Sequence, residues 1–261
     1  MILSDDDRQT LRATAAAMAD AARIETLRHF RSPALRPDNK AATGFDPVTQ
    51  ADRASECAMR AILAERRPQD EEYGARPGTS GLTWVLDPID GTRAYLCGAP
   101  SWGVLIGLTD ADGAIYGIVD QPWTGERFEG GWGAARLASP HGAGDLTVRG
   151  GVQLADATLM TTYPEVGTPA EGAAFRRVAE RVRLTRYGLD CYAYALLALG
   201  QVDLVIEAGL QAYDIVAPMA VVQAAGGIVT DWQGGPAHGG GQVIAAATPD
   251  LHAAALVLLN A

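Results

Sequence analysis

Cysteines, basic residues and long hydrophobic runs are all scarce in this sequence. It contains three cysteines, with no Cys-x-x-Cys or Cys/His spacing of the kind that binds zinc. Cys57, Cys97 and Cys191 are too few and too scattered for a disulfide framework. We therefore expect free thiols that are buried or partly buried.

Basic residues are outnumbered by acidic ones. The chain has 21 Lys and Arg against 31 Asp and Glu, a formal net charge of -10. This argues against non-specific nucleic-acid binding, because such binding requires clustered cations. No uninterrupted apolar run reaches the roughly 18 residues of a membrane span, and the opening from Met1 to Asp7 lacks the basic start of a signal peptide. We expect a cytoplasmic protein without nucleic-acid or membrane partners.

One stretch, Trp84-Val-Leu-Asp-Pro-Ile-Asp-Gly-Thr92, places two carboxylates after an apolar strand. The strand is expected to end at Asp87, because Pro88 has no N–H with which to continue a ladder. Gly91 permits a sharp turn, which would bring the backbone N–H of Thr92 back towards both carboxylates.

The oxygens of this turn form a candidate cation site. Asp87, Asp90 and the Ile89 carbonyl would supply hard oxygen ligands, which suit Mg²⁺. The alternative is that both aspartates only cap a turn, since Asp readily bonds nearby backbone N–H groups. The stretch alone does not decide between the two interpretations.

Further carboxylates occur at element boundaries. Asp46 precedes a predicted helix, where a simple cap is the alternative. Glu71 lies in a loop after Pro68, where acidic residues are usually solvated. Asp214 lies at or near the start of a helix that stops at Gly226-Gly227.

Hydrophobic residues make up 48% of the chain, enough for one large domain or two closely joined ones. Helical patterns span residues 4–31 and 49–66, and β patterns follow at 102–108, 115–120, 126–129 and 145–148. Beyond residue 150, predicted strands and helices alternate at 158–162, 170–181, 183–187, 191–199, 202–206, 214–225, 228–231, 243–246 and 249–259. We expect an α/β (α+β) protein in one compact unit. Its N-terminal α+β half, residues 1–150, carries the metal loop and an antiparallel sheet, and its C-terminal α/β half, residues 151–261, completes the site.

Four motifs occur in one order along most of the chain, and together they resemble the inositol monophosphatase family. They are Asp46-Pro-Val-Thr-x-Ala-Asp52, Glu71-Glu72, Trp84-Val-x-Asp-Pro-Ile-Asp-Gly-Thr92, and Asp214 before an Ala-rich helix. The resemblance implies a layered α-β-α-β-α sandwich, of the inositol monophosphatase and fructose bisphosphatase type. It also implies Mg²⁺-dependent hydrolysis of small phosphate monoesters by metal-activated water, and a homodimer.

The resemblance also implies site roles. Two or three Mg²⁺ ions, with Mn²⁺ as a possible substitute, would be held by Glu71, Asp87, the Ile89 carbonyl, Asp90 and Asp214. Thr92, paired with Asp46, would orient or deprotonate the attacking water, and Glu71 could assist. Backbone N–H groups of Gly91 and Thr92 would bind phosphate oxygens.

Weaker motifs are closer to the histidinol-phosphate phosphatases of that family. They are the stretch from Asp120 to Arg127, the stretch from Gly188 to Tyr194, and the Tyr213-Asp214 pair. By this resemblance, Asp190 and Glu207 would face the non-phosphate part of the substrate.

The implied reaction is hydrolysis of L-histidinol phosphate to L-histidinol and phosphate, a step of histidine biosynthesis. The ammonium and imidazole of this substrate suit carboxylates, but a polyol could also donate hydrogen bonds to them. An inositol-1-monophosphatase, a broad small-molecule phosphatase and a catalytically silent metal- or phosphate-binding regulator are the alternatives. Two departures weaken the substrate assignment: Asp70 replaces a common Gly, and Arg93-Ala94 replaces Lys-Ser.

Overall fold

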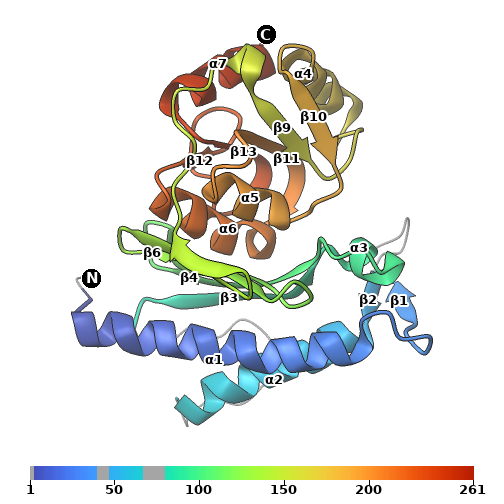
Figure 1. The fold of residues 1–261 in the computed structure, drawn as a ribbon, viewed down its shortest axis with the longest axis vertical. Coiled ribbons are helices and arrows are strands. Elements are labelled where there is room, and N and C mark those ends of the chain that lie inside the picture. Colours follow the sequence, from blue (N-terminus) through green and yellow to red (C-terminus); the bar gives the residue numbers. More distant parts are fainter. Residues whose placement is uncertain (1–2, 40–46, 67–79) are drawn as a thin grey trace.

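The structure, a computed structural model, describes residues 3–39, 47–66 and 80–261. Helices and sheets are stacked in five layers, in the order α-β-α-β-α (Figure 1). Helices α1 and α2 cover one face of a six-stranded sheet, and α5 and α6 separate that sheet from a five-stranded one. Helices α4 and α7 form the last layer. The predicted layered sandwich is confirmed.

The bounds of the elements follow the chain. The helices are α1 Asp5–His29, α2 Gln50–Arg66, α3 Thr92–Cys97, α4 Pro169–Ala179, α5 Tyr192–Ala198, α6 Ala212–Ala224 and α7 Pro249–Leu259. The six-stranded antiparallel sheet has, in spatial order, β3 Thr83–Asp90, β4 Gly103–Thr109, β5 Ala114–Gln121, β6 Glu126–Gly131, β7 Ala134–Ser139 and β8 Gly142–Asp145. The five-stranded mixed sheet has β10 Leu184–Tyr187, β9 Thr158–Thr161, β11 Leu204–Gln211, β13 Gly240–Ala246 and β12 Ile228–Thr230. A small pair, β1 Pro37–Asn39 and β2 Pro47–Thr49, and the 3₁₀ turn Leu154–Asp156 complete the described elements.

Helix α1 begins with a capping box in which the Ser4 hydroxyl accepts the Asp7 N–H and the Asp7 carboxylate accepts the Ser4 N–H. Its buried face is formed by small or flexible residues, including Ala15, Met18 and Ala22. Because these residues recur every three or four positions, they form one stripe that packs on the sheet and on α2. None of the described helices is long and apolar enough to span a membrane.

Helix α6 lies directly on the first sheet because three neighbouring strands carry glycine beneath it. Gly107, Gly117 and Gly130 pair with one another across β4, β5 and β6. A Cβ added at Gly107 would lie only 2.5 Å from Val216 Cγ1. At Gly117 it would lie 2.4 Å from the Ala217 carbonyl oxygen, and at Gly130 it would lie 2.5 Å from Val221 Cα. The helix backbone therefore lies on the strands at Gly117 and Gly130, and the Val216 side chain lies on Gly107.

Two sequence predictions about strands are wrong. Strand β3 does not end at Asp87 but continues through Pro88 to Asp90. It is an edge strand, and a register shift between Asp87 and Asp90 absorbs the missing N–H. The strand predicted at 145–148 is misplaced: β7 and β8 form a hairpin that ends at Asp145, and no strand covers residues 146–148. Its Gly- and Ala-rich strands lack the β-branched residues that mark a strand in sequence.

Candidate active site

Three carboxylates from two distant segments converge. Asp87 and Asp90 lie at the end of β3, and Asp214 is the third residue of α6. One carboxylate oxygen from each lies within 4.8 Å of the other two. This spacing allows all three to share one cation, and hard carboxylate oxygens suit Mg²⁺ or a similar ion.

Hydrogen bonds from backbone N–H groups orient these carboxylates. The Ile89 N–H donates to Asp87 Oδ1 at 3.0 Å, and the Gln211 N–H donates to Asp214 Oδ2 at 2.7 Å, as part of a capping box. The Cys191 N–H donates to Asp90 Oδ2 at 2.7 Å. Each of these carboxylates therefore accepts a backbone N–H, which limits its rotation.

The turn after β3 is tight because Gly91 adopts a left-handed conformation, with φ +78°, as the N-cap of α3. The Thr92 hydroxyl donates to the Ile89 carbonyl at 3.0 Å. The predicted metal-ligand carbonyl and the predicted water-orienting hydroxyl are therefore bonded to each other. A carbonyl oxygen has two lone pairs, so this bond leaves it able to accept a second partner.

Mutual repulsion and burial disfavour the charged forms of the cluster. Burial, followed by the charges of Asp90 and Asp214, raises the pKa of Asp87 well above its ordinary value. Burial, followed by Asp190 and Asp214, raises the pKa of Asp90 to about 8. A bound cation would reverse both effects, so this donor set fits a metal site.

The acidic cluster lines a pocket of about 850 Å³. The structure brings together eight of the residues predicted for the site, all of which line this pocket: Asp87, Ile89, Asp90, Gly91, Thr92, Asp190, Glu207 and Asp214. The two other predicted residues, Asp46 and Glu71, lie outside the described residues, as does Asp70.

Asp190 lies between the turn at Gly91 and the segment after α3, which contains Ser101. Its backbone is left-handed, with φ +49°, which is uncommon for a residue other than glycine. The Ser101 hydroxyl donates to Asp190 Oδ2 at 3.3 Å, and a Cβ built on Gly91 would lie 2.8 Å from Asp190 Cγ. Burial raises the pKa of Asp190 to about 6, against the opposing effects of Ser101 and Arg93.

Glu207, on β11, is the second of the two predicted substrate-facing acidic residues that line the pocket without belonging to the cluster. It is only 6% exposed and accepts three hydrogen bonds: from the Thr161 hydroxyl at 3.1 Å, the Thr162 N–H at 2.6 Å and the Thr162 hydroxyl at 2.9 Å. Burial nevertheless raises its pKa to about 7. The predicted strand at 202–206 extends to Gln211, and a bulge follows Glu207.

Among the pocket-lining residues to which sequence reasoning assigned no site role are Arg93, Tyr163 and Tyr194. The Arg93 guanidinium donates to the Tyr163 hydroxyl at 2.5 Å and lies 5.3 Å from the centre of its ring. The Tyr194 hydroxyl is buried in the wall and makes no hydrogen bond to any described group. Arg93 was noted only as a departure from a motif. The 70 positions between Arg93 and Tyr163 left no sequence signal for their contact.

Known proteins share both this sequence pattern and this fold. Residues 7–260 match the profile of the inositol monophosphatase family. The chain is 39% identical to the bifunctional phosphatase IMPL2 of Arabidopsis thaliana, over 89% of this chain and 67% of that protein. It is 35% identical to a histidinol-phosphatase of Mycobacterium tuberculosis, over 95% of this chain and 96% of that protein. An inositol monophosphatase structure from Zymomonas mobilis has a TM-score of 0.85 and 38% identity, covering 95% of this chain and 97% of that one. The chain thus belongs to the inositol monophosphatase family, whose members act on small phosphorylated substrates.

Proposed function

We propose that this protein is a Mg²⁺-dependent phosphatase that hydrolyses L-histidinol phosphate to L-histidinol and phosphate. One observation carries the substrate assignment: two further carboxylates, Asp190 and Glu207, line the same pocket as the cluster of Asp87, Asp90 and Asp214. A phosphate bound at the cluster would leave the rest of a small substrate within this acidic pocket.

In this proposal the three clustered carboxylates hold the metal, together with the Ile89 carbonyl and Glu71. When bound, two or three Mg²⁺ ions, or Mn²⁺ in their place, would neutralise phosphate charge and lower the pKa of a bound water. Backbone N–H groups of Gly91 and Thr92 would bind phosphate oxygens.

Thr92 would orient the attacking water. Its hydroxyl donates to the Ile89 carbonyl, so its oxygen can accept a hydrogen bond from water without moving. Passing a proton on to Asp46 would instead require the hydroxyl to rotate away from Ile89. Thr92→Ser keeps this hydroxyl, whereas Thr92→Val removes it.

The carboxylates of Asp190 and Glu207 would bind the ammonium and imidazole of histidinol phosphate. Their raised pKa values, about 6 and about 7, mean that a cationic substrate would favour their charged forms. Tyr163 and Tyr213, 43% and 48% exposed, line the same pocket and offer aromatic faces to an imidazole. The histidinol-phosphatase of M. tuberculosis among the relatives supports this assignment.

Inositol 1-phosphate is the second candidate, because both carboxylates can accept hydrogen bonds from hydroxyl groups. The similarity to the Z. mobilis inositol monophosphatase favours it. A broad small-molecule phosphatase and a catalytically silent metal- or phosphate-binding regulator remain further candidates. We also propose a homodimer, which light scattering would detect as twice the chain mass of 27.4 kDa.

The deciding experiment measures Mg²⁺-dependent phosphate release from histidinol phosphate, inositol 1-phosphate, 3′-phosphoadenosine phosphate and fructose bisphosphate. We expect kcat/KM to favour histidinol phosphate by roughly a hundredfold, about 2.7 kcal/mol of transition-state binding. Asp190→Asn and Glu207→Gln should each reduce this preference. Equal rates on inositol 1-phosphate would overturn the substrate assignment, and no release from any ester would overturn the enzyme assignment.

A further inference from the structure

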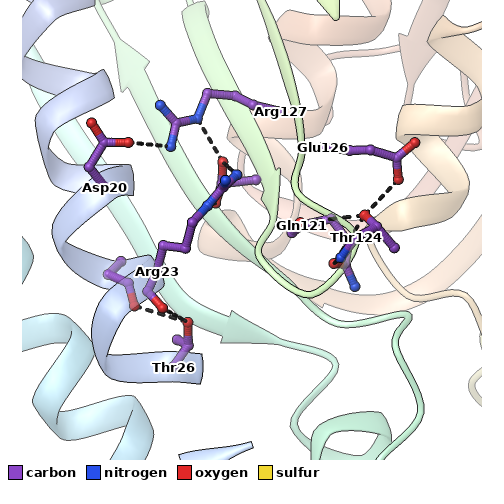
Figure 2. Close-up of polar contacts among 9 residues, drawn as sticks. Asp20, Arg23, Thr26, Gln121, Thr124, Glu126 and Arg127 are labelled. Atoms are coloured by element: carbon purple, nitrogen blue, oxygen red, sulfur yellow. Dashed lines mark hydrogen bonds and ion pairs between the residues drawn. The ribbon is translucent and has the colours of Figure 1, made fainter. Parts of the chain in front are cut away.

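The turn between β5 and β6 is closed by its own side chains. Figure 2 shows Gln121, Thr124 and Glu126 bonded in series. The Thr124 N–H donates to Gln121 Oε1 at 2.8 Å, and the Thr124 hydroxyl donates to Glu126 Oε2 at 2.7 Å. Gln121 is fully buried. These hydrogen bonds make the turn rigid, so it can hold the neighbouring segments that bond to it.

One connection runs from this turn to the carboxylate of Asp190. The Gln121 amide donates to the Pro100 carbonyl at 2.7 Å. The next residue, Ser101, is buried, and its hydroxyl donates to Asp190 Oδ2 at 3.3 Å. Gln121 therefore fixes the backbone that presents the Ser101 hydroxyl to Asp190.

A second connection runs from the turn to the backbone around Asp190. The Tyr192 hydroxyl donates to Glu126 Oε2 at 2.7 Å, and the Tyr192 ring packs edge-on against Phe128 with centroids 6.0 Å apart. The Tyr192 N–H donates to the Leu189 carbonyl at 3.0 Å. Tyr192 therefore fixes the chain immediately after Asp190.

Asp190 needs this support because its conformation is unfavourable. Its left-handed backbone, with φ +49°, is uncommon outside glycine, although Asp adopts it more readily than most residues, and such a conformation is held in place by its surroundings. Its carboxylate also packs against Gly91, where there is no room for a Cβ. Without both connections, Asp190 could relax to an ordinary backbone conformation and move its carboxylate away from the metal loop.

We propose that Gln121, Glu126 and Tyr192 are positioning residues for substrate recognition, holding the Asp190 carboxylate where it contacts the non-phosphate part of the substrate. This role rests on the proposed function, since Asp190 must face the substrate. None of the three positioning residues touches the acidic cluster in the described contacts. Their loss should therefore change substrate affinity and selectivity more than turnover.

Tyr192→Phe is the sharpest test, because it removes the hydroxyl and keeps the ring on Phe128. We expect KM for histidinol phosphate to rise about tenfold while kcat stays within about twofold, with little change for an ester whose alcohol part carries no charge, such as inositol 1-phosphate. Tyr116→Phe is the matched control: the Tyr116 hydroxyl donates to Glu129 at 3.0 Å in the same sheet, and Tyr116 does not line the pocket. It should leave both KM values unchanged.

A double-mutant cycle separates positioning from general stability. If Tyr192 acts through Asp190, Tyr192→Phe should change KM in the wild-type background but not in Asp190→Asn. Glu126→Gln, which keeps an acceptor for the tyrosine hydroxyl, should retain most of the affinity. Equal effects on both substrates, or full additivity with Asp190→Asn, would show a merely structural role and overturn the proposal.

The same variants separate failure of this proposal from failure of the proposed function. If Asp190→Asn removes the preference for histidinol phosphate while Tyr192→Phe has no effect, only the positioning role fails. If inositol 1-phosphate proves the better substrate, the proposed function fails, and the positioning role stands only if Tyr192→Phe and Asp190→Asn are non-additive on that ester. If Asp190→Asn changes no KM on any substrate, Asp190 does not contact the substrate and the positioning role fails, whereas the proposed reaction is still judged by the rates on the four esters.

Discussion

The backbone N–H of Cys191 donates to Asp90 Oδ2 at 2.7 Å, although the two residues are 101 positions apart. This bond lets the C-terminal half orient a carboxylate of the N-terminal half. The rotation of the Asp90 carboxylate within the acidic cluster is therefore limited by a distant segment of the chain.

Asp90→Asn should remove the negative charge of the side chain while keeping its size and its hydrogen bond to Cys191. The asparagine amide oxygen can still accept the Cys191 N–H, but the negative charge needed for a cation is lost. We expect phosphate release to fall by more than about a hundredfold while the metal-free protein melts at the same or a higher temperature. Phosphate-release assays and thermal melts in chelator test both parts. Undiminished hydrolysis would contradict the metal-site assignment.

The stability of the metal-free protein should fall as pH rises. Asp90, Asp190 and Glu207 have pKa values raised to about 8, 6 and 7, so the folded state keeps protons that the unfolded state releases above its ordinary values near 4. Stability is thus fully present below about pH 4 for these groups and is lost by about pH 8. We expect Tm in chelator to be lower at pH 8 than at pH 5 by at least roughly 5 °C. An equal or higher Tm at pH 8 would refute this.

Added Mg²⁺ should restore that stability, and more so at high pH. Metal and protons compete for the same carboxylates, so binding should weaken as pH falls. At a concentration about a hundred times Kd, the gain is about 2.7 kcal/mol, or roughly 5–10 °C in Tm. Asp90→Asn should abolish most of this shift, whereas Asp145→Asn, an exposed change on β8, should keep it. A shift that is the same in both variants would place the ion elsewhere.

Gly91→Ala should weaken substrate binding by displacing the Asp190 side chain. The new Cβ would meet Asp190 Cγ at 2.8 Å, so Asp190 must move. Gly133→Ala is the matched control, because Gly133 has a similar φ of +79° but no neighbouring atom within 4 Å of the point where a Cβ would lie. Both variants should lose about 1 kcal/mol from backbone strain. Only Gly91→Ala should raise KM, which steady-state kinetics would show; equal kinetics would mean that Asp190 does not contact the substrate.

Asp120→Asn should destabilise the whole fold. Asp120 is fully buried and accepts the Arg23 guanidinium at 2.7 and 3.0 Å and Arg127 Nε at 2.6 Å. Figure 2 shows Arg127 also reaching Asp20 on α1, beside Arg23, so this network ties α1 to the sheet. Losing the charge would leave two guanidiniums poorly compensated and cost about 3 kcal/mol.

Asp145→Asn is the control for this effect, because its pair with Arg136 spans 3.7 Å and both side chains are exposed. It should change stability by less than about 0.5 kcal/mol. Denaturant unfolding of both variants measures the difference. A similar small loss at Asp120 would mean that α1 is held by apolar packing alone.

The sequence was most informative where signals are local. Asp87 and Asp90 are three positions apart, and their turn depends on Gly91, so their proximity could be predicted from one short stretch, although that stretch alone did not distinguish a cation site from a capped turn. Asp214 was added by the resemblance, not by any physical signal in its own helix. The path of β3 through Pro88 could not be predicted, because the edge position that tolerates proline is a property of the sheet.

Contacts across the pocket were also beyond sequence reasoning. The bonds of Ser101 and Asp190, and of Arg93 and Tyr163, join segments 89 and 70 positions apart. No local pattern encodes such pairs, because the side chains meet only after both sheets have packed around α6. The sequence suggested that Asp190 faces the substrate, but it gave no sign of the hydrogen bonds that hold Asp190 in place.

The line of Gly107, Gly117 and Gly130 beneath α6 influences the width of the acidic cluster from a distance. At Gly117 and Gly130 the helix backbone lies on strand backbone, and at Gly107 the Val216 side chain fills the space, so side-chain rearrangement can change the height of α6 above the sheet only slightly. That height determines how far Asp214 lies from the two aspartates of β3. The spacing of the three carboxylates thus depends on the absence of side chains at these glycines. One methyl group added there, in the middle of the sheet, would push α6 away from the strands and widen the site.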